Sequence, residues 1–105
     1  MNFSKFKIAV VIPVYRAENE IRSVLRDIPR FVRHIIVVDD ASPDSSADLV
    51  TAAAKKDKRI TLIRHANNQG VGGAMVSGFK QALALGTEIV IKVDGDGQMD
   101  PHYLP

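Results

Sequence analysis

Three oxygen-bearing side chains follow one apolar segment close to the end of the sequence. Residues 89–93 are apolar apart from Lys92, have the length of a β-strand, and lead directly into Asp94, Asp96 and Gln98. Carboxylate and amide oxygens are the donors that hard cations such as Mg²⁺ bind, and such an ion often uses only one or two protein carboxylates when a phosphate supplies further oxygens. The spacing therefore predicts a divalent metal site at Asp94 and Asp96, with Gln98 as a third candidate ligand.

Polar residues also follow each of the other three segments with strand character. Residues 8–14 and 35–38 are continuously apolar and β-branched, and residues 60–63 form a shorter run of the same kind. Such runs are typical of strands buried on both faces of a parallel sheet, and we expect the same of residues 89–93. The polar clusters that follow are residues 15–20, the pair Asp39 and Asp40, and residues 64–69.

Helical periodicity separates these strands. Ile21 to Ile28 repeat at helical spacing, with Asn19 as a cap and Pro29 as the stop. A second helix follows Ser42, Pro43 and Asp44, and its small apolar positions are Ala47, Val50 and Ala54. A third opens at Gly70, Gly72 and Gly73, and we expect Met75, Phe79 and Leu83 to lie in the core. The order β-α-β-α-β-α-β predicts an α/β fold: an open, mostly parallel sheet with helices on both faces.

In an open parallel sheet, ligands bind outside the carboxyl ends of the strands, near the point where the strand order reverses. All four polar clusters follow strand ends. We therefore expect them to meet at one edge of the sheet, which is the strongest evidence from residue pattern for a binding site.

Composition sets wider bounds. The 105 residues, 46% of them hydrophobic, suit one soluble globular domain over residues 1–105. The net charge of +2 says little about partners, and we expect no nucleic acid partner. The sequence has no cysteine, which suits a cytoplasmic protein, and no apolar run long enough to span a membrane. Asp100 and Pro101 are typical of a helix start with no helix after it, so we expect the N-terminal portion of a longer protein.

Several phosphate-binding or metal-binding motifs do not fit. Residues 13–20 contain no glycine, where the dinucleotide fingerprint needs several, and no Gly-Lys-Ser or Gly-Lys-Thr exists. An EF-hand starting at Asp94 would need glycine at Met99 and glutamate at Pro105. A phosphoacceptor receiver domain would carry its acidic pair after the first strand, whereas Asp39 and Asp40 follow the second.

Four motifs together resemble one family. They are Ile12-Pro13-Val14-Tyr15-Arg16-Ala17-Glu18-Asn19-Glu20-Ile21, Val37-Val38-Asp39-Asp40-Ala41-Ser42-Pro43-Asp44, Asn68-Gln69-Gly70-Val71-Gly72-Gly73-Ala74 and Asp94-Gly95-Asp96-Gly97-Gln98. In this order and spacing they resemble family-2 glycosyltransferases, most of all the polyprenyl- or dolichyl-phosphate sugar synthases. The resemblance implies a GT-A fold and transfer of a sugar from a UDP- or GDP-sugar to an acceptor.

The resemblance also implies roles for single residues. Asp40 would accept hydrogen bonds from the nucleotide base with Asp39 nearby, while Pro13, Tyr15 and Glu18 would line the base and ribose pocket. The metal, Mg²⁺ or Mn²⁺, would be held against the diphosphate by Asp94, Asp96 and Gln98. The acceptor would be a lipid phosphate or a glycan, with inversion at the sugar. The catalytic residues of the family would lie beyond Pro105, and the full-length protein would work in the cytoplasm or at the cytoplasmic face of a membrane.

Each feature has a plainer interpretation. Asp40 or Ser42 could simply cap a helix, and the glycines from Gly70 onward could open a helix without touching phosphate. Arg64 and His65 are interpreted as solvated side chains, and Arg16 is left open between solvation and phosphate contact. Two other functions also stay open: a nucleotide-diphosphate binding module without activity, and a sugar-1-phosphate nucleotidyltransferase.

Overall fold

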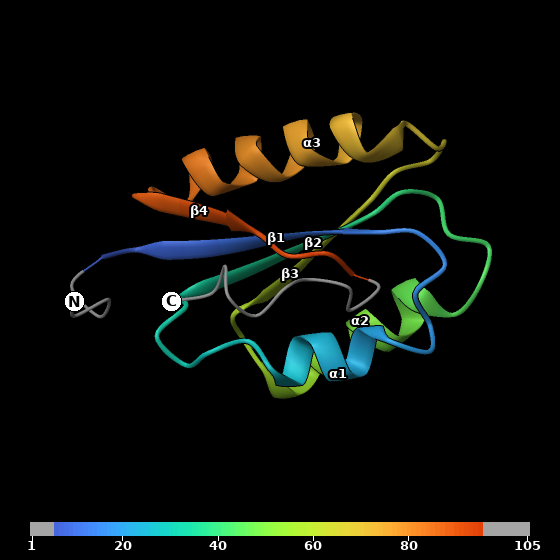
Figure 1. Cartoon of the computed structure of the whole chain (residues 1–105), viewed down its shortest axis with the longest axis horizontal. Helices are drawn as coiled ribbons and strands as arrows, with labels where there is room; N and C mark the ends of the chain where they lie inside the picture. Colours follow the sequence, from blue (N-terminus) through green and yellow to red (C-terminus); the bar gives the residue numbers. More distant parts are fainter. Residues whose placement is uncertain (1–5, 96–105) are drawn as a thin grey trace.

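The computed structural model describes residues 6–95, which form a four-stranded parallel sheet with helices on both faces (Figure 1). The elements are β1 (Ile8–Val14), α1 (Ile21–Arg26), β2 (His34–Asp39), α2 (Ser46–Lys56), β3 (Ile60–Arg64), α3 (Gly70–Ala84) and β4 (Ile89–Lys92). The strand order is β3-β2-β1-β4, so the chain moves outward from β1 and then returns to its other side. The predicted fold class and element order are confirmed.

The two central strands separate two hydrophobic cores. On β1, Val10 and Ile12 lie in the larger core and Val11 in the smaller one; on β2, Val37 and Val38 divide in the same way. Successive side chains of a strand point to opposite faces of the sheet, so a continuous apolar run serves both cores. The expectation that these two strands are buried on both faces is confirmed.

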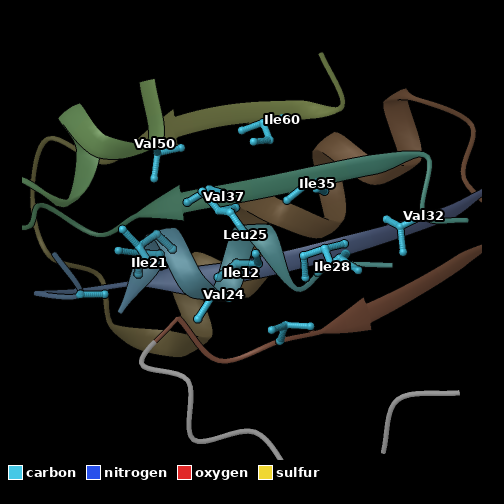
Figure 2. Packing of buried hydrophobic residues seen from close by; sticks show 14 of the residues in the cluster. Ile12, Ile21, Val24, Leu25, Ile28, Val32, Ile35, Val37, Val50 and Ile60 are labelled. Carbon is cyan, nitrogen blue, oxygen red and sulfur yellow. The ribbon is translucent and has the colours of Figure 1, made fainter. Parts of the chain in front are cut away.

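Helices α1 and α2 cover the face of the larger core. Ile21, Val24 and Leu25 of α1 are buried and pack toward Ile12 of β1 and Val37 of β2 (Figure 2). Helix α1 is shorter than predicted: its N-cap is Glu20 instead of Asn19, and its C-cap is Asp27. Ile28 therefore lies after the helix, although it is still buried in this core.

Among residues 6–95, helix α3 alone covers the other face, and it does so through small residues. Its buried positions are Ala74, Gly78 and Ala82, and a side chain at Gly78 would collide with Val11 of β1. The helix therefore lies too close to the sheet for large side chains at the contact. The prediction of core positions is wrong for Phe79, which is 45% exposed, and for Leu83, which is 75% exposed. Met75 is partly buried and packs against the smaller core.

Strand β4 pairs only with β1 among the described residues and is half-buried, so the expectation of a strand buried on both faces is wrong here. This position accounts for Lys92. Its side chain is exposed, and its Nζ lies 3.6 Å from Oδ1 of Asp94.

Candidate functional site

The carboxyl ends of the strands bring the predicted polar segments to one edge. Val14 at the end of β1 is in register with Asp39 at the end of β2, and Asp39 with Arg64 at the end of β3. On the other side of β1, a Cβ added to Gly95 would lie 2.9 Å from the carbonyl oxygen of Pro13. A glycine is therefore needed where the segment after β4 runs along the end of β1. The prediction of a shared edge is confirmed for the described residues.

The carboxylate of Asp40 accepts three hydrogen bonds at this edge. Its Oδ1 accepts hydrogen bonds from His65 Nδ1 at 2.8 Å and from the backbone N–H of Gln69 at 2.8 Å. Its Oδ2 accepts a hydrogen bond from the backbone N–H of Gly70, also at 2.8 Å. The carboxylate thus caps the start of α3, in line with the plainer interpretation that Asp40 caps a helix, and lies where a helix dipole favours negative charge.

These contacts also set the protonation of Asp40. Burial opposes its ionisation, but the hydrogen bonds from the His65 side chain and from the N–H groups of Gln69 and Gly70 outweigh that effect. Together they lower the pKa of Asp40 below the ordinary value for an aspartate. Asp40 is therefore a carboxylate at neutral pH, and a carboxylate can only accept hydrogen bonds.

Asp39 lies on the opposite face of the sheet from Asp40, because the two are neighbours at the end of a strand. Its side chain is fully buried. Oδ2 accepts a hydrogen bond from the N–H of Ser42 at 3.2 Å and lies 3.9 Å from Arg64 Nε, while Oδ1 has no hydrogen-bond partner among the described residues. Arg64 itself is largely exposed, in line with its plainer interpretation.

A small cavity of about 60 Å³ joins three of the predicted residues. Pro13, Tyr15 and Asp40 line it, and its other walls are Val14, Gly70, Val71 and Ala74. Tyr15 is 49% exposed, and the Arg16 guanidinium lies 5.5 Å from the centre of its ring. The cavity therefore combines apolar walls, an accessible aromatic ring and one carboxylate.

The backbone turns sharply beside this cavity. Arg16 follows β1 with a φ of 54°, and Ala41 follows β2 with a φ of 61°. Residues other than glycine rarely adopt this left-handed conformation, and where they do the surrounding structure must hold them. Here the N–H of Arg16 donates to Ser42 Oγ at 3.0 Å, which ties the two turns together.

Glu18 lies outside the small cavity. Its Oε2 accepts a hydrogen bond from the N–H of Ser45 at 3.0 Å, and its own N–H donates to Asp44 Oδ2 at 3.3 Å. Glu18 instead lines a neighbouring open cleft of about 420 Å³ with Arg16, Asn19, Pro43 and Asp44. Through its two hydrogen bonds, Glu18 connects the loop after β1 to the start of α2.

The predicted metal ligands are only partly described. Asp94 follows β4, and its half-exposed carboxylate has the donor chemistry that a hard cation requires. Asp96 and Gln98 lie outside the described residues. Within residues 6–95, three or more His, Cys, Asp or Glu side chains do not gather into a metal-binding cluster.

His65 and Ser77 are the site residues that sequence reasoning missed. The interpretation of His65 as a solvated side chain is wrong: its side chain is 7% exposed, and its second ring nitrogen, Nε2, lies 2.7 Å from Ser77 Oγ. The signal was weak, because His65 falls in a polar cluster where exposure is the ordinary outcome and Ser77 is one small residue inside a helix.

In the described part of the chain, the helices are all too short or too polar to cross a membrane.

The family of this chain follows from comparison with known proteins. Residues 9–105 match the model of the family described as "Glycosyl transferase family 2". The chain therefore belongs to glycosyl transferase family 2, as its four motifs indicated.

Two curated relatives illustrate this family. The chain is 34% identical to an undecaprenyl-phosphate mannosyltransferase of Micrococcus luteus, with 94% of this chain and 42% of the relative covered. It is 32% identical to a UDP-N-acetylglucosamine–dolichyl-phosphate N-acetylglucosaminyltransferase of Methanococcus voltae, with 92% and 44% covered. The chain thus spans less than half the length of these relatives.

Solved structures show the same fold. The mannosyltransferase PcManGT from Pyrobaculum calidifontis, in complex with GDP-Man and Mn²⁺, superposes with a TM-score of 0.78 and 26% identity, covering 87% of this chain and 28% of that one. GalNAc-T7 with UDP, GalNAc and Mn²⁺ has a TM-score of 0.60 at 19% identity, over 86% and 18% of the two chains, which supports the fold alone. The predicted GT-A fold is confirmed.

Proposed function

We propose that this chain forms the nucleotide-binding part of an enzyme that transfers a sugar from a UDP- or GDP-sugar to a polyprenyl phosphate, with inversion at the anomeric carbon. The observation that carries this proposal is the meeting of Pro13, Tyr15 and Asp40 around one cavity, at the sheet edge where Gly95, the residue after Asp94, lies against the end of β1. The mannosyltransferase that shares this fold was solved with a nucleotide sugar and Mn²⁺.

Asp40 gives the cavity a preference among bases. An ionised carboxylate offers about four acceptor positions on its two oxygens. His65 and Gln69 use two on Oδ1, and Gly70 uses one on Oδ2, so within the described part of the chain one position on Oδ2 is left for a ligand. Uracil and guanine carry a ring N–H that can donate to it, whereas the matching ring nitrogen of cytosine or adenine is itself an acceptor. Tyr15 and Pro13 would hold the flat face of the base.

A divalent cation, Mg²⁺ or Mn²⁺, would be held by Asp94, Asp96 and Gln98. When bound, it would neutralise the negative charge that develops on the departing diphosphate. Lys92 Nζ lies 3.6 Å from Asp94 Oδ1, so its charge would compete with a cation for this carboxylate. Two relatives are named for lipid-phosphate acceptors, and a phosphate monoester, with a second pKa of about 6, attacks without a strong general base. We expect the protein to act in the cytoplasm or at the cytoplasmic face of a membrane.

Calorimetric titration of the intact protein with UDP, GDP, CDP and ADP, each with and without Mn²⁺, tests the binding site. We expect UDP or GDP to bind in the presence of Mn²⁺ at least tenfold more tightly than CDP or ADP, a difference of about 1.4 kcal/mol. Asp94→Ala and Asp96→Ala should abolish the Mn²⁺ dependence. Asp27→Ala, at the end of α1, is the matched control and should change nothing. Failure of all four nucleotides to bind would contradict the proposal.

A transfer assay separates the three enzyme and binding hypotheses. The intact protein is incubated with a labelled UDP- or GDP-sugar and undecaprenyl phosphate in detergent, and a labelled lipid product supports the transferase. Nucleotide binding without product supports the binding module. Pyrophosphate release from a sugar-1-phosphate and UTP or GTP would support the nucleotidyltransferase instead.

A further inference from the structure

We propose that His65 is a positioning residue that holds the Asp40 carboxylate in the orientation needed to read the nucleotide base. This inference rests on the function proposed above. The observation behind it is a chain of two hydrogen bonds through His65. Asp40 Oδ1 lies 2.8 Å from His65 Nδ1, and His65 Nε2 lies 2.7 Å from Ser77 Oγ. The side chains of His65 and Asp40 are each 7% exposed.

Chemistry fixes the direction of the first hydrogen bond. Ionised Asp40 is only an acceptor, so Nδ1 of His65 must carry the hydrogen. In the neutral ring, Nε2 is then an acceptor and takes a hydrogen bond from the Ser77 hydroxyl. The imidazole thus connects the carboxylate to the middle of α3, and its plane is set by a contact at each end.

The consequence for the ligand lies in the other carboxylate oxygen. Because His65 and the N–H of Gln69 donate to Oδ1 and the N–H of Gly70 donates to Oδ2, the carboxylate cannot rotate without breaking three hydrogen bonds. Among the described residues, Oδ2 then keeps one open acceptor position, and Asp40 lines the cavity together with Tyr15. Without the His65 contact, Oδ1 would have an open position too, and the carboxylate would lose the difference between its two oxygens.

The order Asp40, His65, Ser77 is also that of a serine-hydrolase triad, but the surroundings do not fit a nucleophile. Ser77 lies within α3, where neighbouring N–H groups are part of the helix. An oxyanion hole needs free donors beside the nucleophile. The position of the three residues agrees better with a role in holding the orientation of the Asp40 carboxylate.

Two substitutions of His65 separate its two hydrogen bonds. His65→Asn places an amide N–H close to the position of Nδ1 and keeps the bond to Asp40, whereas His65→Gln reaches the position of Nε2 and keeps only the bond to Ser77. We expect His65→Gln to weaken binding of UDP or GDP with Mn²⁺ by about tenfold and His65→Asn by no more than about threefold. His34→Gln, at the start of β2, is the control substitution and should have no effect.

If His65→Gln only damaged the fold, it would weaken the binding of nucleotide and of inorganic pyrophosphate alike. Because His65 acts through the base contact, His65→Gln should leave the affinity for inorganic pyrophosphate with Mn²⁺ unchanged, and its effect should disappear in an Asp40→Ala background. Equal losses in His65→Asn and His65→Gln, or an equal loss for pyrophosphate, would overturn the inference and leave the nucleotide site standing. Absence of nucleotide binding by the wild-type protein would overturn both.

A measurement on the wild-type protein covers the case in which His65→Gln does not fold. With ¹⁵N-labelled histidine, NMR should show a protonated Nδ1 on His65 whose resonance shifts when UDP or GDP is added with Mn²⁺. An unprotonated Nδ1, or a resonance unaffected by nucleotide, would overturn the proposed role.

Discussion

Asp39 and Asp40 are adjacent in the sequence but have different environments. Asp39 is fully buried, with one oxygen that lacks a hydrogen-bond partner among the described residues. Asp40 has three donors around it and lines the cavity. We therefore interpret Asp40 as the residue that reads the base and Asp39 as a carboxylate that holds the turn after β2 through Ser42.

Replacing Asp40 by Asn should weaken both the fold and the site. The amide has one acceptor oxygen where the carboxylate has two. At least one of the N–H donors of His65, Gln69 and Gly70 therefore loses its charged partner. We expect the free energy of unfolding to fall by about 1.5–3 kcal/mol, the range for hydrogen bonds to charged groups. Urea unfolding measures this loss, and a change below about 0.5 kcal/mol would contradict the role of Asp40 in fixing α3.

Asp40 should also make the fold sensitive to acid. Its pKa is lower in the folded protein than in the unfolded chain, so the folded state binds its proton more weakly. The stabilisation is therefore complete above the ordinary aspartate value of about 3.9 and is lost as pH falls through the lower folded pKa. Asp44, whose pKa is lowered by hydrogen bonds from Ser46 in spite of burial, acts in the same direction.

Unfolding measured in urea between pH 6 and pH 2.5 tests this. We expect stability to fall below about pH 4 in the wild type, and to fall less steeply in Asp40→Asn, because one linked proton is removed. Identical slopes for the two proteins would show that Asp40 does not contribute.

At the scale of elements, α3 packs on the sheet through a face without large side chains. Ala74, Gly78 and Ala82 form this face, and the approach at Gly78 is too close for even one methyl group beside Val11. This close approach places the start of α3 next to the end of β2, where Gln69 and Gly70 reach Asp40. The packing of the helix thus positions part of the candidate site.

Two glycines of α3 form a matched pair for testing this packing. Gly78→Ala should destabilise the fold by about 1–3 kcal/mol, the usual cost of overpacking. Gly72→Ala introduces a side chain with nothing within 4 Å and should be neutral or stabilising by up to about 1 kcal/mol, because alanine favours the helix. Thermal or urea unfolding of both variants measures the difference, and equal effects would show that α3 is not in close contact with β1.

Two neighbouring residues near the end of α3, one exposed and one buried, form a second pair of test positions. Leu83 is 75% exposed and Ala82 is fully buried. Leu83→Ser should therefore change the free energy of unfolding by less than about 0.5 kcal/mol, whereas Ala82→Ser buries a hydroxyl and should cost about 1–3 kcal/mol. A large loss for Leu83→Ser would indicate that this side chain is buried in the intact protein.

At the scale of the whole molecule, the site joins loops that follow three strands, and a ligand that contacts several of them should stabilise the fold. Saturating UDP or GDP with Mn²⁺, at about 100 times the dissociation constant, should add about 2.7 kcal/mol to the free energy of unfolding. For a chain of this length, that corresponds to a rise of roughly 10–20 °C in the melting temperature by calorimetry. Mn²⁺ alone should give a smaller rise, and no rise with any nucleotide would count against the proposed site.

The sequence alone determined the order of elements and the shared edge. Continuous β-branched runs can be satisfied only in a sheet covered on both faces, and parallel strands must carry their following loops to the same edge. Residue pattern was therefore sufficient to bring Tyr15 and Asp40 to the same edge, whereas the grouping of Pro13, Tyr15 and Asp40 around a nucleotide base came from the resemblance to the family. Glu18 was predicted with them but lies in the neighbouring cleft, because its carboxylate binds the start of α2.

Only the tertiary structure decided which side chains meet. The distance between α3 and the sheet is set by how closely Gly78 can approach Val11, and that distance places Phe79 and Leu83 outside the core. The burial of His65 depends on Ser77, twelve residues away, and on Asp40. Local pattern carries no information on such contacts, because hydrogen bonds between loops depend on how the helices pack and not on the residues beside them in the chain.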